Sequence, residues 1–221
     1  MAWLVDLLLP RRCVSCGVSA DVLCGDCLSR LGPLTAPRCA RCGAPTAWDV
    51  ERCRECAGRR LAFASARAAV AYAGPARPLL RAWKEHGLRR VADLAAALVV
   101  AHVEPPAADV IAYIPPERSR QLQRGRHPAE RLARELGSRW CLETAPLLER
   151  TRPGTRQTGL SRAERGANVR GAFAATAEAP RTVLLVDDVY TTGATAGAAA
   201  TALRAAGAAR VHVVTFARTV R

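Results

Sequence analysis

The chain has 221 residues, half of them apolar and a quarter charged, which suits one globular domain of ordinary size and a smaller one. Its net charge of +14 comes from 32 arginines and one lysine against 19 acidic residues, and it predicts anionic partners such as nucleotides, pyrophosphate or nucleic acid. The longest apolar run, residues 94–103, is shorter than the roughly 20 residues that span a bilayer. Residues 3–9 are apolar but lack the basic flank of a signal peptide. We therefore expect a cytoplasmic protein without membrane insertion.

Eight of the nine cysteines form four Cys-x-x-Cys pairs: Cys13/Cys16, Cys24/Cys27, Cys39/Cys42 and Cys53/Cys56. Such a turn presents two thiolates to one ion, and two turns complete a tetrahedral Zn(Cys)₄ site. Disulfides are the alternative, which an intracellular setting disfavours. We predict one or two structural zinc ions held by these eight cysteines. A sequential pairing of neighbouring turns is favoured, and a crossed pairing stays open. The ninth cysteine, Cys141, is expected to be a small buried residue.

This cysteine-rich segment is predicted to be a double zinc-ribbon-like module, residues 1–60, in front of a larger domain, residues 61–221. The module holds nine arginines and six acidic residues, a net charge of +3. Two Zn(Cys)₄ centres, each of charge −2, would bring the net charge to about −1. A nearly neutral module is better interpreted as a structural or docking unit than as a DNA reader.

The middle of the chain alternates strand and helix patterns. Residues 63–72 and 109–114 are β-compatible, and the sequence predicts helices over three segments, residues 77–86, 92–102 and 128–140. Arginines crowd the loop at 118–126 and the segment 150–170, which lacks apolar periodicity. Long loops of this kind are commonly functional lids. We expect both segments to face an anionic ligand.

Residues 182–206 predict a strand, a ligand-binding loop and a helix. Thr182 to Val186 is an apolar, β-branched run typical of a strand buried on both faces of a parallel sheet. Asp187 and Asp188 follow it, and a loop of small residues and hydroxyls leads into an Ala-rich helix with Gly207 as its cap. Backbone N–H groups and hydroxyls at a helix N-terminus suit a phosphate dianion, and two carboxylates suit sugar hydroxyls. Together they predict a site for a ribose 5-phosphate.

This stretch resembles the phosphoribosyl-pyrophosphate (PRPP) motif of type I phosphoribosyltransferases, in which two acidic residues and two aliphatics precede Thr-Thr-Gly-x-Thr. Tyr190 departs from the usual small aliphatic. The resemblance implies an α/β fold with a central parallel sheet flanked by helices. It also implies that Asp187 and Asp188 face the ribose hydroxyls and that the loop holds the 5-phosphate through Thr191, Thr192, Gly193, Ala194 and Thr195.

Further segments narrow the resemblance to the competence-associated ComF phosphoribosyltransferases. The segments that recur in that family, in this order, are the four Cys-x-x-Cys pairs, residues 72–75 leading to Trp83-Lys84, Arg124-Gly125, and residues 155–161, 165–168 and 171–173 ahead of the PRPP motif. The resemblance covers nearly the entire chain. It implies a zinc module on a type I phosphoribosyltransferase domain, with a link to DNA uptake in some members.

An enzyme of this type would hold the ribose, neutralise the leaving pyrophosphate and exclude water. Mg²⁺ would accompany PRPP, because this ion binds mostly through substrate phosphates. Candidates for the pyrophosphate and the closing lid are basic residues: Lys84, Arg118, Arg120, Arg124, Arg152, Arg156 and Arg165. No side chain is assigned as the catalytic acid or base, and the acceptor stays open.

A second hypothesis is a non-catalytic protein that keeps the PRPP-type site and binds single-stranded DNA or a competence partner. The family commonly has Arg-Gly-Phe-Asn-Gln where this chain has Arg124-Gly125-Arg126-His127-Pro128, which favours lost or changed catalysis. Single-strand binders usually stack bases on aromatic side chains. With ten aromatic residues in the chain, the DNA hypothesis gains little support.

Overall fold

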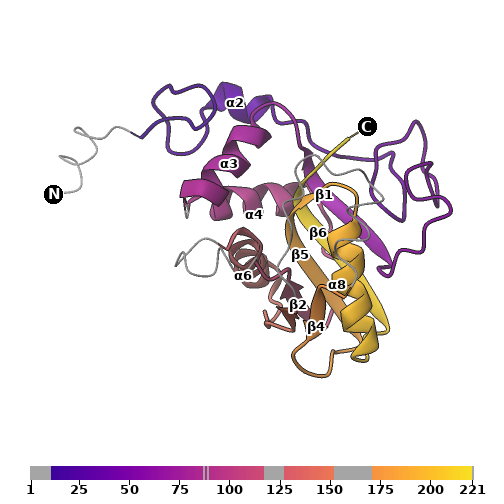
Figure 1. Ribbon diagram of the computed structural model, residues 1–221. Coiled ribbons are helices and arrows are strands. Elements are labelled where there is room, and N and C mark those ends of the chain that lie inside the picture. Colours follow the sequence, from indigo (N-terminus) through magenta and orange to yellow (C-terminus); the bar gives the residue numbers. More distant parts are fainter. Residues whose placement is uncertain (1–10, 87, 89, 117–126, 152–170, 221) are drawn as a thin grey trace.

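The computed structural model describes residues 11–86, 88, 90–116, 127–151 and 171–220 (Figure 1). The helices are α2 (Gly25–Ser29), α3 (Ala76–His86), α4 (Arg90–His102), α6 (Pro128–Trp140) and α8 (Ala194–Ala205). The strands are β1 (Ser65–Ala71), β2 (Val110–Tyr113), β3 (Leu148–Arg150), β4 (Phe173–Ala175), β5 (Thr182–Tyr190) and β6 (Arg210–Arg218). The predicted alternation of strands and helices is confirmed.

A four-stranded parallel sheet in the order β1-β6-β5-β2 forms the centre of the molecule. Strand β5 lies inside it, and Val183 to Val186 are buried on both faces, as their unbroken apolar run predicts. The strand is longer than predicted. Pairing with β6 continues as far as Tyr190 opposite Arg218, so both Asp187 and Asp188 belong to the strand and do not follow it.

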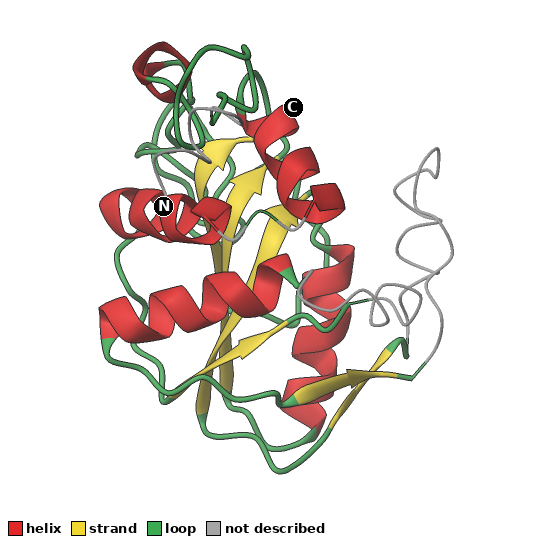
Figure 2. Ribbon diagram, turned by 90° about the vertical axis from the view of Figure 1, so that its left-hand side faces the viewer, coloured by secondary structure: helices red, strands yellow, loops and turns green. Residues whose placement is uncertain are grey.

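Helices cover both faces of the sheet. Helices α3, α4 and α6 pack on one face, where Leu184 and Val186 of β5 point into a core with Trp83 and Leu132. In Figure 2, seen from that side, these helices lie in front of the strands. Helix α8 and the antiparallel pair β3-β4 cover the other face. The predicted α/β class with a central parallel sheet flanked by helices is therefore confirmed.

The cysteine-rich segment packs against the sheet. The amides of Leu34 and Ala71 bond the carbonyls of Ala69 and Gly32, at 2.8 Å each, so the chain covers the outer edge of β1. Covering an edge strand removes an unpaired row of backbone groups that could otherwise pair with another chain. Cysteines of the second pair of turns also lie in the core beside α8. The cysteine turns are therefore built into the hydrophobic cores of the protein.

Two further expectations can be compared with the structure. Cys141 is exposed, so the prediction that it is buried was wrong: it caps the C-terminus of α6 in a left-handed conformation with a φ of 54°, facing outward. Within the described residues, no helix is both long and apolar enough to cross a bilayer.

Candidate functional site

The eight paired cysteines gather into two clusters, each with four sulfur atoms within 4.8 Å of one another: Cys13, Cys16, Cys24 and Cys27, then Cys39, Cys42, Cys53 and Cys56. The pairing is sequential, as the spacing favoured. Sulfur atoms at the corners of a zinc tetrahedron lie about 3.8 Å apart, for a Zn–S bond of about 2.3 Å. The Cys39–Cys56, Cys42–Cys53 and Cys53–Cys56 distances are 3.6, 3.5 and 4.0 Å. The sulfur set therefore fits a tetrahedral zinc ion.

In the second cluster, backbone hydrogen bonds stabilise a thiolate. Burial disfavours the charged form of Cys39, but backbone N–H groups of Cys42 and Cys53 donate to its sulfur at 3.5 and 3.3 Å. With these donors the pKa of Cys39 falls to about 7. The pKa of Cys42, in contrast, is raised by burial and by its neighbour Cys53. Four adjacent thiols do not ionise together without a cation, and a bound zinc ion supplies that charge.

Two carboxylates at the carboxyl end of β5 form the acidic part of a second candidate site. Asp188 is buried, and its Oδ2 lies 2.7 Å from the Nζ of Lys84 on helix α3. Burial alone lowers the pKa of Lys84, but the charge and hydrogen bond of Asp188 outweigh it, so the net pKa is raised. The predicted contact residue Lys84 is thus brought directly to the predicted ribose site.

Asp187 lies in a different electrostatic environment from Asp188. Burial, then the charge of Asp188, raises the pKa of Asp187 to about 8, against the smaller opposing effect of Lys84. Its Oδ1 accepts a hydrogen bond from the amide of Asp188 at 2.8 Å. At neutral pH the Asp187 carboxyl is therefore largely protonated. Strongly shifted carboxyls in a pocket are typical of functional sites.

The loop after β5 and the N-terminus of α8 complete this site. The residues that line the small pocket here are Asp187, Val189, Tyr190, Thr191, Gly193, Thr195, Ala196 and Thr215. Gly193 is the N-cap of α8 in a left-handed conformation, with a φ of 74°, and it offers no capping side chain. The first N–H groups of a helix lack partners within the helix, and they attract anions. Thr192 is buried, and its Oγ1 accepts from the amide of Ala194 at 3.3 Å.

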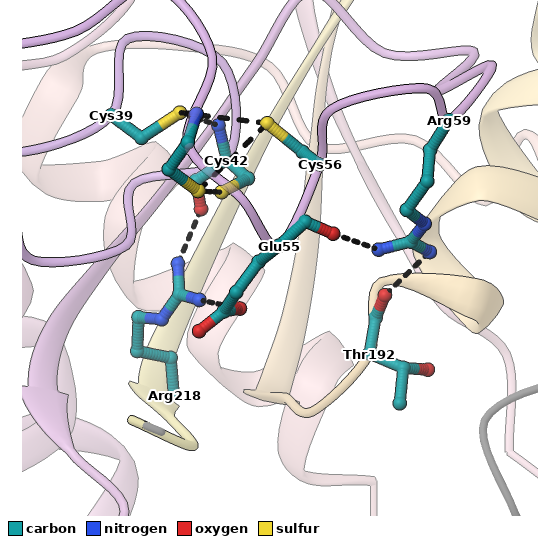
Figure 3. A network of polar contacts seen from close by, with 8 residues as sticks. Cys39, Cys42, Glu55, Cys56, Arg59, Thr192 and Arg218 are labelled. Carbon is teal, nitrogen blue, oxygen red and sulfur yellow. Dashed lines mark hydrogen bonds and ion pairs between the residues drawn. The ribbon is translucent and has the colours of Figure 1, made fainter.

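A layer of residues that the sequence did not single out lies beneath this loop (Figure 3). Arg59, which follows the last cysteine turn, donates to the carbonyl of Thr192 at 2.8 Å. The guanidinium of Arg218 lies 5.0 Å from the ring centre of Tyr190. Arginine-to-carbonyl contacts across such sequence distances leave no local pattern, so no sequence signal could have found Arg59 or Arg218.

Comparison with known proteins agrees with this architecture. Residues 4–57 match the double zinc ribbon domain family. Competence protein F of Haemophilus influenzae is 28% identical, over 94% of this chain and 96% of its own length. The chain is a relative of competence protein F. The DNA utilization protein YhgH of Escherichia coli K12 is 29% identical over 97% of this chain and all of its own length.

The relationship to competence protein F confirms the predicted resemblance to the ComF proteins, and the matching domain family supports structural zinc at the two clusters. A solved structure, glutamine PRPP amidotransferase from B. subtilis, is also similar, with 25% identity and a TM-score of 0.38. That similarity spans 58% of this chain and 26% of the amidotransferase chain.

The predicted ligand residues divide into two groups. The structure brings together Lys84 and the seven residues predicted to hold the ribose and its phosphate: Asp187, Asp188, Thr191, Thr192, Gly193, Ala194 and Thr195. The arginines predicted for the pyrophosphate and the lid lie outside the described residues: Arg118, Arg120, Arg124, Arg152, Arg156 and Arg165. Of the altered stretch 126–128, Arg126 also lies outside the described residues, whereas His127 and Pro128 lie at the start of α6.

Proposed function

We propose that the protein binds PRPP and acts as a Mg²⁺-dependent phosphoribosyltransferase whose acceptor is a nitrogen nucleophile. The observation that carries the proposal is one pocket in which Asp187 and the Thr191–Thr195 loop meet. Its acidic end suits ribose hydroxyls, and its helix N-terminus suits a 5-phosphate. The carboxylates and the loop also stand in the same order along the chain as in the PRPP motif that the sequence resembles.

In this proposal the residues of the pocket orient the ribose and leave its anomeric carbon free. Asp188 accepts from one ribose hydroxyl while Lys84 holds its carboxylate in place at 2.7 Å. Asp187 offers a second acceptor when ionised. The N–H groups at the start of α8 bind the 5-phosphate. Fixing a reactant in this way lowers the entropic part of the barrier.

Magnesium fits the same site by the chemistry of its donors. Hard oxygen ligands are those that Mg²⁺ prefers, and it usually binds through one or two carboxylates together with substrate phosphates. Asp187 lines the pocket, and Asp188 follows it in β5, where it pairs with Lys84. When bound with PRPP, the ion would neutralise part of the pyrophosphate charge.

Calorimetric titration with PRPP, with and without Mg²⁺, tests the proposal. Asp188→Asn should weaken PRPP binding at least tenfold, as expected when a charge-assisted hydrogen bond of about 1.5–3 kcal/mol is lost, and Asp187→Asn should do so above pH 8, where this carboxyl is ionised. The matched control is Asp109→Asn, because Asp109 lies at the opposite end of β5 and accepts from the amide of Thr182 at 2.7 Å. Equal affinities in all four proteins would refute the proposal.

Binding alone does not establish transfer, so the acceptor requires a separate assay. Release of pyrophosphate from PRPP would be followed against a panel of purine and pyrimidine bases and amines. Release that depends on one acceptor and is lost in Asp188→Asn supports an enzyme. PRPP binding without release from any member of the panel would favour a binding protein.

A second candidate function is binding of single-stranded DNA or of a competence partner at the PRPP-type site. The observation that favours it is the relationship to proteins named competence protein F and DNA utilization protein. Binding of an oligonucleotide would be measured across a salt series, because phosphate contacts make affinity fall steeply with salt. DNA binding that PRPP does not displace, in a protein that PRPP does not stabilise, would support this function over the first.

A further inference from the structure

The loop that is proposed to bind phosphate is hydrogen-bonded to the second zinc ribbon, residues 38–59, although more than 130 residues separate the two along the chain. Arg59 spans the gap: one of its nitrogens donates to the carbonyl of Thr192 at 2.8 Å, and the other lies 3.4 Å from the carbonyl of Glu55. The carbonyl of Thr192 lies one residue before the N-cap of α8, Gly193. Arg59 therefore links this loop to the backbone of the second zinc ribbon.

The position of Arg59 is set by the metal-binding turn. Its own amide bonds the carbonyl of Cys56 at 3.2 Å, and the amides of Cys56 and Ala57 bond the carbonyl of Cys53 at 3.1 and 2.8 Å. Cys53 and Cys56 are two of the four cluster ligands. A bound zinc ion would thus fix the turn from which Arg59 extends, and loss of the ion would free it.

Arg218 supplies a second connection on the same side of the loop. It is almost wholly buried at the end of β6, where it donates to the carbonyl of Cys42 and, at 3.0 Å, to the carboxylate of Glu55. Figure 3 shows these two contacts reaching both halves of the second cysteine cluster. Arg218 therefore joins the zinc ribbon to the central sheet.

The ring of Tyr190 fills the space between Arg218 and the loop. It meets Phe63 edge-on, with 6.2 Å between ring centres, and lies under the guanidinium of Arg218. A Cβ added at Gly193 would come within 2.3 Å of the Tyr190 hydroxyl. The ring thus packs directly beneath the first residue of the helix terminus, and the zinc ribbon, the ring and the loop form one stack.

We propose that Arg59 is a positioning residue for the phosphate loop, and that the second zinc ribbon, through Arg59 and the Arg218–Tyr190 stack, fixes this loop for its ligand. The proposal rests on the proposed binding of a ribose phosphate. It assigns the ribbon a role in the ligand site itself. The first zinc cluster differs from the second: Asp21, beside it, forms ion pairs with Arg11 and with Arg90 of helix α4, and nothing described there contacts the loop.

The test compares Arg59→Gln with Arg41→Gln in the full, zinc-loaded chain. Arg41 belongs to the same ribbon and also donates to a backbone carbonyl, that of Leu61 at 2.7 Å, but not to the loop. Two readouts are used: affinity for ribose 5-phosphate by calorimetry, and hydrogen exchange of the amides of residues 191–197 without ligand. We expect Arg59→Gln to weaken binding about tenfold and to speed exchange of the loop, while Arg41→Gln changes neither.

Arg59→Lys, which keeps one donor, should recover part of the affinity, a result that a general loss of stability would not give. Equal exchange and equal affinity in Arg59→Gln and wild type would overturn the inference, as would the same changes in Arg41→Gln. If wild type binds neither ribose 5-phosphate nor PRPP, the proposed function fails, and loop exchange alone decides the role of Arg59. If Arg59→Gln does not fold, Arg59→Lys and Arg41→Lys provide the same comparison.

Discussion

The ion pair between Lys84 and Asp188 offers the sharpest test of how the site is built. Replacing Lys84 by Met keeps the length and packing of the side chain but leaves the buried Asp188 beside Asp187 without its cation. Removing one partner of a fully buried pair costs about 3–5 kcal/mol, whereas exposed pairs contribute about 0–1 kcal/mol. The Lys84 side chain is 36% exposed and that of Asp188 is 12% exposed. Because solvent screens this half-open pair, we expect a loss of about 2 kcal/mol.

Thermal unfolding of the zinc-loaded protein without ligand measures this loss. A change of 1 kcal/mol shifts the Tm of a protein of this size by about 2–4 °C, so Lys84→Met should lower it by about 4–8 °C. The control is Arg81→Met on the same helix, whose pair with Glu85 is 3.3 Å long and exposed on both sides. That change should cost less than about 0.5 kcal/mol.

The cause can be isolated by a second substitution and by pH. Adding Asp188→Asn to Lys84→Met should restore most of the lost stability, because the buried uncompensated charge disappears. The pKa of Asp187, raised to about 8, gives the sign of the pH effect. A folded-state pKa above the unfolded value means that the native protein holds the extra proton, so its stability falls as pH rises from about 4 to 8. Without Lys84 this fall should be steeper. A double variant as unstable as Lys84→Met would refute the reasoning.

Three further changes test other parts of the structure. Asp187→Asn should raise the Tm of the ligand-free protein by a few degrees at pH 8 but not at pH 4, and should abolish stabilisation by PRPP, as thermal scans at both pH values will show. Gly193→Ala should cost about 1–2 kcal/mol in urea unfolding, because of the left-handed φ and the Tyr190 ring, whereas Gly197→Ala in the open part of α8 should be neutral or stabilising. Removing zinc with a strong chelator should release two ions per chain, by elemental analysis, and make residues 1–60 sensitive to protease; a digestion pattern unchanged by chelation would contradict the structural role of the metal.

The parts of the fold that a sequence can predict are those that local patterns encode. Helix α6 was predicted as residues 128–140 and spans Pro128–Trp140, because a proline at its start and an apolar stripe define it. The sequential pairing of the cysteines was favoured although their spacing left a crossed pairing open, and the structure has the sequential pairing. The carboxylates and the threonine loop were predicted together because strand, loop and helix follow one another directly.

The remaining features depend on contacts between distant parts of the chain. The extension of β5 through Tyr190 depends on pairing with β6, which a buried apolar run cannot reveal, since the run stops at Val186. The buried Arg218 has no counterpart in any local rule, because arginines are mostly exposed unless paired. Tyr190 was noted only as a departure from an aliphatic. Its role as the platform under Gly193 required the fold.

The charges of the described site indicate which other residues must contribute to the binding free energy of PRPP. At neutral pH the Lys84 and Asp188 charges cancel, and the raised pKa of Asp187 leaves that carboxyl largely protonated. The helix terminus and the charge of Arg59 beside the loop then remain to attract an anion, and the effect of the terminus is about 0.3–1 kcal/mol per charge in exposed settings. This can orient a single phosphate but not neutralise a pyrophosphate. Residues 117–126 and 152–170 carry nine arginines and two glutamates, a net of +7 that equals half of the whole chain's +14. Discrimination between PRPP and ribose 5-phosphate should therefore depend on these two segments and weaken with salt, whereas affinity for ribose 5-phosphate should depend on β5 and the zinc-held loop.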